Sequence, residues 1–318
     1  MYHLGVDLGG TNIAVGVVDD NFKIIGRSNV KTERSNGADA IVDNIVLAVE
    51  EAIKSTNISQ KDIVAVGLGS PGSIDSENGI VVWSENLGFN RLPLCSILKE
   101  RTGFDFYIEN DANAAAYGEF IAGVGIGKNS LVAITLGTGV GSGVIIDKKI
   151  FAGINHTGTE IGHTVICFDG IPCNCGRKGC WETYASATAL IRQTKEKMLE
   201  HKDSIMWEIS PDIEAVNGRT SFDAMRKGDK YAKEVVEQYI EYVAIGVCDV
   251  VNVFQPDVLC IGGGISKEGD TLILPIREYF NKCGYTRTYK ENTIITTAKL
   301  GNDAGIIGAA FLCDLYKK

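Results

Sequence analysis

DLGGTN, at residues 7–12, and LGTGVG, at residues 136–141, each lie between two short runs of β-forming residues. Both stretches place a Gly-Thr pair in a tight turn, where successive backbone N–H groups and a threonine hydroxyl are exposed together. Such donors suit the oxygens of a phosphate group. One turn of this kind is more often only a hairpin. Two of them, one at the start of each half of the chain, predict two similar α/β halves that hold a triphosphate across a cleft.

The residues around these turns predict strands followed by helices in each half. Strands are expected in the runs at residues 4–9, 12–19, 23–32, 62–72, 104–110, 130–147, 148–153 and 257–265. Helices are expected at residues 38–56 and 111–123, across most of residues 184–253 and, as one closing helix, at residues 302–316. No low-complexity linker separates the halves. We therefore expect a smaller α/β domain of residues 1–112 with the C-terminal helix at 303–318, and a larger α/β domain of residues 113–302 that carries a cysteine cluster.

Composition argues against several classes of protein. The 318 residues carry 31 Lys and Arg against 40 Asp and Glu, a formal net charge of −9, and no basic stripe that would bind nucleic acid. The N-terminus, MYHLGVDLGG, lacks the basic region of a signal peptide, and the apolar runs are too short to span a bilayer. We therefore expect a cytoplasmic protein that binds neither nucleic acid nor membrane.

Two further glycine motifs fail the test of their context. Gly67, Gly69 and Gly72 fit the dinucleotide fingerprint G-x-G-x-x-G, but that motif should open a helix, and here Gly72 leads into a turn and a strand. The run around Lys128 resembles a P-loop, yet Asn129 replaces the Ser or Thr that binds Mg²⁺. Neither motif supports nucleotide binding by itself.

A set of short motifs runs along nearly the whole chain. Besides DLGGTN and LGTGVG, the set consists of SPG at 70–72, ENL at 85–87, END-AN at 109–113, GINHTGTEIGH at 153–163, CNCGRKGCWETYAS at 173–186, IGGG at 261–264 and GNDAGIIGAA at 301–310. In this order and spacing the chain resembles the ROK family (repressors, open reading frames, kinases) of the actin-like sugar kinase superfamily, and within it looks most like bacterial glucokinases.

The resemblance implies a two-domain actin-like (ribonuclease H-like) α/β sugar kinase fold with a cleft between the domains, and a homodimer. It implies ATP-dependent phosphorylation of the 6-hydroxyl of glucose to glucose 6-phosphate, with the sugar and Mg²⁺-ATP as ligands. The repressors of the family carry an N-terminal DNA-binding domain, whereas this sequence begins at the first phosphate strand, so the kinase branch is expected. A kinase for N-acetylmannosamine, N-acetylglucosamine or fructose is the alternative, and a non-catalytic sugar-sensing regulator is a third.

Two positions depart from the glucokinase pattern. Trp181 stands where leucine is common, and EIGHTVI, at residues 160–166, stands where EVGHM is common. We expect both departures to lie near the sugar pocket.

The catalytic base is expected at Asp111. Phosphoryl transfer needs in-line positioning, neutralised charge and a base for the attacking hydroxyl. Asp111 stands where a strand meets a helix, and the resemblance places the family's catalytic aspartate there. Such an aspartate is often only a helix N-cap, but the preceding Glu109-Asn110 pair favours the catalytic interpretation. A carboxylate whose pKa is near its ordinary value is ionised at neutral pH and can accept the proton.

The motif match also assigns the residues that contact the two substrates. It places the sugar against Gly72, Asn86, Asn110, Asp111, Glu160, His163 and Glu182. It places the nucleotide against Asp7, Gly9, Gly10, Thr11, Asn12, Thr138, Gly139, Gly262, Gly263 and Gly264, with Asp7 holding Mg²⁺ through water. For Asn86 and Glu182 a loop surface and a helix start are the simpler interpretations. The last three glycines suit a strand-to-helix turn equally well.

A metal site is the remaining expectation. Four of the nine cysteines fall in one short stretch, which in a reducing compartment indicates metal binding rather than disulfides. The residues His163, Cys173, Cys175 and Cys180 supply one imidazole and three thiolates, a set that suits tetrahedral Zn²⁺. Cys167 falls outside this pattern. If one ring nitrogen of His163 binds zinc, the other faces the sugar with its tautomer fixed, and the structural zinc shapes the sugar pocket.

Overall fold

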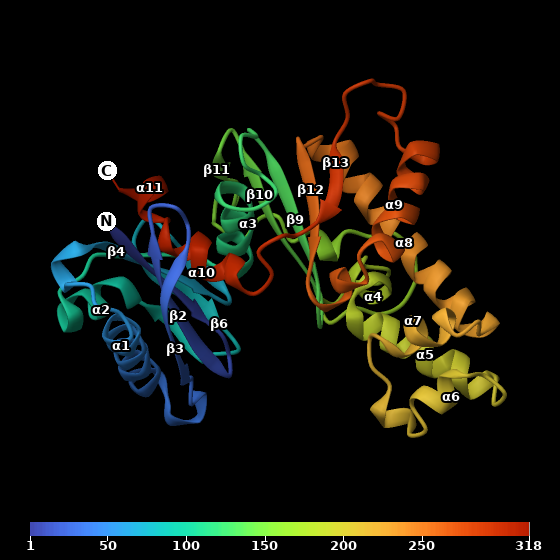
Figure 1. Cartoon of the computed structure of the whole chain (residues 1–318), viewed down its shortest axis with the longest axis horizontal. Coiled ribbons are helices and arrows are strands. Elements are labelled where there is room, and N and C mark those ends of the chain that lie inside the picture. The colour runs from blue at the N-terminus through green and yellow to red at the C-terminus, as the bar shows by residue number, and fades with distance from the viewer. Residues whose placement is uncertain (318) are drawn as a thin grey trace. The chain divides into compact units, whose positions relative to one another are not determined.

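A computed structural model describes residues 1–317 of the chain (Figure 1). The chain forms two compact units. Unit 1 comprises Met1–Ala133, Gly143–Thr159 and the chain from Lys299 onward, and unit 2 comprises Ile134–Ser142 and Glu160–Ala298. The domain boundary that the sequence predicts near residue 112 falls inside unit 1, and it stays a prediction.

Unit 1 is built on a five-stranded sheet with the order β3-β2-β1-β4-β8. Its strands are β1 (Tyr2–Leu8), β2 (Asn12–Asp19), β3 (Ile24–Lys31), β4 (Ile63–Ser70) and β8 (Phe106–Asn110). The first three form the predicted antiparallel meander, while β4 runs parallel to β1 and β8 parallel to β4. The carboxyl ends of parallel strands meet at one edge of a sheet. Asp7, Gly69 and Asn110 therefore lie in neighbouring strands at that edge.

The other elements of unit 1 form a small sheet and several helices. They are β5 (Ser73–Asp75), β6 (Ile80–Ser84), β7 (Phe89–Leu92), α1 (Ala38–Lys54), α2 (Leu94–Thr102), α3 (Asp111–Ile121), α10 (Asp303–Ala310) and α11 (Cys313–Tyr316). Helix α1 packs on β2 and β3. It buries the apolar residues at helical spacing, namely Ile41, Ile45, Val49 and Ile53. Leu4 of β1 belongs to the same apolar core.

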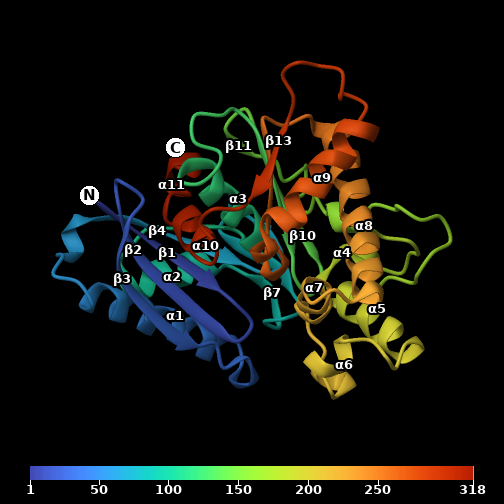
Figure 2. The same ribbon diagram turned by 45° about the vertical axis from the view of Figure 1, so that its right-hand side comes forward.

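The C-terminal helix α10 packs on the face of this sheet opposite to α1 (Figure 2). Gly5 follows Leu4 in β1, and successive strand residues point to opposite faces. A Cβ atom at Gly5 would lie 1.8 Å from the carbonyl oxygen of Ile306. One at Gly67 would lie 1.7 Å from the carbonyl oxygen of Ala309. Glycine at these positions lets the helix backbone approach the sheet directly.

The prediction of a single closing helix at residues 302–316 is wrong. Helix α10 ends at Ala310, and the separate short helix α11 begins at Cys313. Phe311, at the break, is buried and stacks on His3 with ring centroids 4.4 Å apart. This tertiary contact holds the chain in a turn at a point where local helix propensity alone would continue the helix.

A second five-stranded sheet has the order β11-β10-β9-β12-β13. Its strands are β9 (Leu131–Leu136), β10 (Val140–Ile146), β11 (Lys149–Ile150), β12 (Val258–Gly262) and β13 (Ile294–Thr297). The strand–turn–strand predicted at residues 130–147 is confirmed. The sequence patterns do not predict β13 or α9 (Asp270–Cys283), because β13 has only 4 residues and Pro275 interrupts the helical pattern of α9.

Unit 2 is mainly helical between residues 184 and 253, as predicted. Its helices are α4 (Glu182–Ala185), α5 (Ala187–Glu200), α6 (Met206–Ile209), α7 (Thr220–Arg226), α8 (Lys230–Phe254) and α9. Trp181 is fully buried against α8, where its Nε1 donates to the carbonyl of Tyr242 at 2.8 Å. A Cβ atom at Gly246 would lie 2.0 Å from the Trp181 ring. The Trp181 side chain therefore fills the helical core. Within residues 1–317, no helix is long and apolar enough to cross a membrane.

Candidate active site

The turn from β8 to α3 carries the predicted base. Asn110 is the N-cap of α3, because its Oδ1 accepts hydrogen bonds from the N–H groups of Ala112 at 2.9 Å and Asn113 at 3.2 Å. Asp111 is the first residue of the helix, and its Oδ1 accepts a bond from the Ala112 N–H at 2.9 Å. Asn110 therefore takes the capping role that the sequence allows for Asp111, so capping does not explain the aspartate.

Burial raises the pKa of both Asp7 and Asp111 at this edge of the first sheet. Burial raises the pKa of Asp111 above its ordinary value, although the Ala112 N–H stabilises the charged form. Burial and, second, the charge of Asp111 raise the pKa of Asp7 to about 6. The prediction of an ordinary pKa for Asp111 is therefore wrong. A divalent cation beside these carboxylates would offset their repulsion, which suits the Mg²⁺ role predicted for Asp7.

An Asp7→Asn variant is expected to be more thermostable than wild type when no nucleotide is bound. The folded-state pKa of about 6 exceeds the ordinary value of 3.8, so the native state binds more protons and loses stability as pH rises through this window. Above it, removal of the charge stabilises the fold by up to about 3 kcal/mol. Calorimetric Tm values at about pH 4.5 and about pH 8 measure the gain, which should be larger at the higher pH. An equal gain in Asp39→Asn, which changes an exposed aspartate in the first turn of α1, would contradict this.

The first predicted phosphate turn lies between β1 and β2. The Gly9 N–H donates to the carbonyl of Asn12 at 3.0 Å and closes the turn, while Thr11 and Asn12 are exposed at its tip. Asn86, on the turn between β6 and β7, is exposed beside it. A Cβ atom at Gly10 would lie 4.0 Å from the Asn86 Cβ. The structure thus brings a predicted sugar ligand next to the predicted phosphate turn.

Gly72 packs tightly between β6 and the Asn110 side chain. Its φ of +110° is one that other residues rarely adopt, and a Cβ atom there would lie 2.2 Å from the carbonyl oxygen of Trp83. The Nδ2 of Asn110 donates to the Gly72 carbonyl at 3.2 Å. The backbone geometry therefore requires glycine here, independently of the predicted sugar contact.

The second predicted phosphate turn, between β9 and β10, is held by Glu182. The Gly137 N–H donates to the carbonyl of Gly139 at 3.0 Å, and Thr138 is exposed at the tip. The Val140 N–H donates to Oε2 of Glu182 at 3.0 Å. Glu182 begins α4 and is half-buried. It therefore fixes the turn and occupies one of the N–H groups that the turn would otherwise offer to a phosphate.

The EIGH segment packs on the same turn. It forms a short 3₁₀ helix, Ile161–His163, directly after the exposed Glu160. A Cβ atom at Gly162 would lie 2.2 Å from the carbonyl oxygen of Val140. Two predicted sugar ligands, Glu160 and His163, are therefore carried by a backbone that contacts the second phosphate turn.

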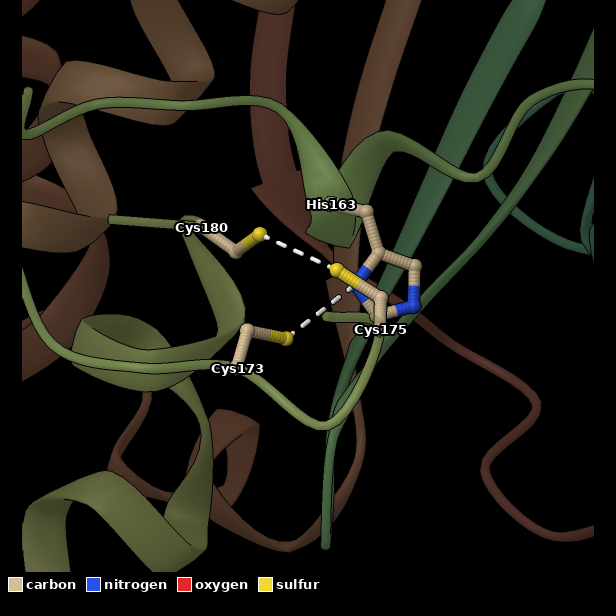
Figure 3. A group of neighbouring side chains, drawn as sticks. All are labelled: His163, Cys173, Cys175 and Cys180. Carbon is tan, nitrogen blue, oxygen red and sulfur yellow. Dashed lines mark hydrogen bonds between the residues drawn. The ribbon is translucent and has the colours of Figure 1, made fainter. Parts of the chain in front are cut away.

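Four side chains of unit 2 surround one point: His163, Cys173, Cys175 and Cys180 (Figure 3). Their ligand atoms all lie within 4.8 Å of one another. The His163 Nδ1 is 3.6 Å from the Cys173 Sγ. The Sγ atoms of Cys175 and Cys180 are 3.5 Å apart. Tetrahedral bonds of about 2.3 Å to sulfur and about 2.0 Å to nitrogen put such ligand atoms about 3.5–3.8 Å apart. The four residues therefore fit a Zn²⁺ ion.

Neighbouring groups favour the thiolate and orient the histidine. Hydrogen bonds from the backbone and side chain of Arg177 lower the pKa of Cys175 to about 6. The Arg177 guanidinium also donates to the carbonyl of His163 at 2.7 Å. Because Nδ1 of His163 faces the sulfur atoms, its Nε2 points away from them (Figure 3). Oε1 of Glu182 lies 3.9 Å from the Cys173 Sγ, so one carboxylate contacts both the cysteine cluster and the second phosphate turn.

The three glycines at Gly262–Gly264 form a strand-to-helix turn. They end β12 and lead into a short 3₁₀ helix, Gly264–Glu268. Gly263 has a φ of +85°, and a Cβ atom there would lie 2.4 Å from the carbonyl oxygen of Leu136. The simpler of the two interpretations is therefore present in the structure, and the adenosine contact stays a prediction.

Glu109 has hydrogen-bond partners at the catalytic turn that the sequence motifs do not predict. Glu109 precedes Asn110 and is fully buried, and the hydroxyl of Tyr316 donates to it at 2.5 Å. The available signal is an acidic residue directly after the apolar residues FYI of β8.

Known proteins are similar to this chain over nearly its whole length. Residues 3–315 match the ROK family. The chain is 37% identical to a glucokinase of Thermotoga maritima, over 96% of this chain and 95% of that protein. It is 36% identical to a glucokinase of Halalkalibacterium halodurans, over 98% of this chain and 94% of that one. Among solved structures, a ROK family glucokinase from Streptomyces griseus in complex with glucose and AMPPNP aligns with a TM-score of 0.81 at 35% identity, over 98% of this chain and 99% of that one. This chain therefore belongs to the ROK family and has the two-domain actin-like fold of its sugar kinases.

Proposed function

We propose that this protein is an ATP-dependent glucokinase, which transfers the γ-phosphoryl group of ATP to the 6-hydroxyl of glucose and forms glucose 6-phosphate. One observation carries the proposal. Asp111 is held at a helix start in a chain that is 35% identical, over 98% of its length, to a glucokinase solved with glucose and AMPPNP. Glucose and this analogue of ATP correspond to the two substrates of the proposed reaction.

Asp111 acts as the general base in this reaction. The ionised carboxylate accepts the proton of the 6-hydroxyl while the sugar oxygen bonds to the γ-phosphorus, and the bond from that phosphorus to the leaving oxygen of ADP breaks. The raised pKa of Asp111 makes it a stronger base than an ordinary aspartate. Turnover is therefore lost as pH falls through this pKa, because the protonated acid cannot accept the hydroxyl proton.

The sugar is bound by fixed polar groups. We assign its hydroxyls to Asn86, Asn110, Asp111, Glu160, His163 and Glu182, with the ring against the backbone of Gly72. The bonds of Asn110 illustrate how such a group is fixed. Its Oδ1 caps α3 and one Nδ2 hydrogen binds the Gly72 carbonyl, so the second Nδ2 hydrogen can bind a hydroxyl. A sugar that lacks the matching hydroxyl leaves such groups unpaired, which gives the site its specificity.

The nucleotide is assigned to the glycine-rich turns. The phosphate groups lie against Gly9, Gly10, Thr11, Asn12, Thr138 and Gly139, and the adenosine lies against Gly262, Gly263 and Gly264. Asp7 holds Mg²⁺ through water, a mode that suits a cation that keeps part of its hydration shell. When bound, this ion neutralises charge on the phosphate groups.

A structural zinc ion is assigned to His163, Cys173, Cys175 and Cys180, whose spacing fits it. The Nδ1 of His163 is the ligand atom because it faces the sulfur atoms. A histidine bound to metal through one nitrogen carries its proton on the other, so Nε2 donates a hydrogen bond to the sugar. The zinc in this proposal shapes the sugar site and takes no part in the transfer.

A panel of sugars tests the function. Purified protein with Mg²⁺ and ATP is supplied with glucose, fructose, N-acetylglucosamine or N-acetylmannosamine, and ADP formation is coupled to an absorbance change. The highest kcat/KM is expected for glucose. A higher kcat/KM for another sugar would identify that sugar as the preferred substrate. Sugar binding without turnover would indicate a sugar-sensing regulator. Zinc measured on the same sample should approach one ion per chain.

Two further parts of the proposal rest on membership of the family. We propose that the protein is a homodimer and that it acts in the cytoplasm. Sedimentation equilibrium of the purified protein checks the first, because a dimer has twice the mass of the 34.2 kDa chain.

A further inference from the structure

A complete hydrogen-bond network surrounds the fully buried carboxylate of Glu109. Its Oε1 accepts from the Asn110 N–H at 2.8 Å and from the side-chain amide of Asn113 at 3.1 Å. Its Oε2 accepts from the hydroxyl of Ser76 at 2.8 Å and from the hydroxyl of Tyr316 at 2.5 Å. The two oxygens of an ionised carboxylate offer about four acceptor sites. The four donors therefore occupy all of these acceptor sites.

Two of these donors flank the proposed base. Asn110 comes directly before Asp111 and Asn113 comes two residues after it, so Glu109 binds the catalytic turn on both sides. Asn110 also caps α3. Burial of a carboxylate is costly unless it is fully hydrogen-bonded, so a network of this kind is rigid as long as every donor is present.

The fourth donor comes from the other end of the chain. Tyr316 is the last residue of α11, and burial, followed by the neighbouring Glu109, raises the pKa of its phenol. The hydroxyl therefore stays protonated and remains a donor. Because α11 is a separate helix after the break at Phe311, its direction is free to bring Tyr316 to Glu109, 207 residues away in sequence.

We propose that Glu109 and Tyr316 are positioning residues for the transfer step, an inference that rests on the proposed kinase function. Tyr316 holds Oε2 of Glu109, which directs Oε1 at the Asn110 N–H and the Asn113 amide. Those two bonds fix the backbone of Asp111 and so the direction in which its carboxylate meets the sugar hydroxyl. A small misplacement of a reacting group is enough to slow an enzyme strongly.

Tyr316→Phe is the main test, because it removes one donor and keeps the ring. It is expected to lower kcat by about tenfold, with KM for glucose and for ATP within about twofold of wild type. Glu109→Gln, whose amide hydrogens oppose the existing donors, should lower kcat further. Tyr117→Phe is the matched control. It removes the hydroxyl of a buried tyrosine on α3 that donates none of the four bonds to Glu109, and its kcat should remain that of wild type.

A double variant separates positioning from general destabilisation. If Tyr316 acts through Asp111, Tyr316→Phe should lower kcat by less than about twofold when Asp111 is already Asn. A tenfold loss in both backgrounds would overturn the proposal, as would equal losses in Tyr316→Phe and Tyr117→Phe. Assays run well below the measured Tm of every variant keep unfolding out of the comparison.

The two proposals fail in different ways. If the wild-type protein phosphorylates none of the four sugars, the kinase function is wrong and the positioning role falls with it. If the wild type is active and Tyr316→Phe matches it, only the positioning role is wrong.

Discussion

Replacement of Asp111 by asparagine is expected to lower kcat for glucose phosphorylation by about 10²- to 10⁴-fold, the usual contribution of a general base. Asparagine keeps the size of the side chain and still accepts the Ala112 N–H, so α3 begins at the same residue. It cannot take the hydroxyl proton. KM for glucose should change far less than kcat, because the lost interaction belongs to the transition state. Steady-state rates from the coupled ADP assay measure both constants.

Asp39→Asn is the control for this change. Asp39 also stands in the first turn of a helix, α1, but it is exposed and lies outside the proposed site. Its kcat should equal that of wild type. Equal turnover by wild type and Asp111→Asn would rule out the base assignment, even if glucose remained the substrate.

Loss of Cys175 is expected to affect metal content, stability and sugar affinity together. Cys175→Ala leaves three ligands, and a structural zinc ion is normally bound by four. Because metal binding to such a site is coupled to folding, the free energy of unfolding should fall by about 3 kcal/mol or more. The KM for glucose should rise by about tenfold or more, since His163 loses the ion that orients it and Glu182 contacts Cys173, another of the metal ligands.

Three measurements on one preparation check this, namely zinc by elemental analysis, Tm by calorimetry and KM by the coupled assay. Cys283→Ala, which removes an exposed thiol at the end of α9, is the matched control and should leave all three unchanged. A zinc-free Cys175→Ala enzyme with the KM of wild type would show that the cysteine cluster has no part in sugar binding. Removal of zinc from the wild type by a chelator should reproduce the higher KM.

The elements that the sequence predicts are those whose pattern is local. Helix α1 shows apolar residues at every turn, and the β1–β3 meander shows short apolar runs between turn residues, so both are predicted correctly. The break after α10 depends instead on the stacking of Phe311 on His3, 308 residues away in sequence. No local pattern contains such a contact. Helix α9 is missed for a different reason. Pro275 is a local signal against a helix, yet the helix continues through it.

For the cysteine cluster, the sequence predicts which side chains come together, but not how the neighbouring residues are held. The cysteine spacing and the motif order name the four side chains that the structure brings together around one point. The bond from the Val140 N–H to Glu182 and the raised pKa of Asp111 follow from burial and from partners distant in sequence. Neither can be derived from the motifs alone.

The packing of α10 on β1 and β4 also determines when unit 1 can finish folding during synthesis. Both strands lie within the first 70 residues, whereas α10 begins at Asp303. A ribosome that adds about 5–20 residues per second needs about 10–50 s to make the chain between them. Throughout that interval the sheet face at Gly5 and Gly67 lacks the helix that covers it in the folded protein. The strands β1 and β4 leave the ribosome long before α10, so unit 1 can be completed only after residues 71–302 have been translated.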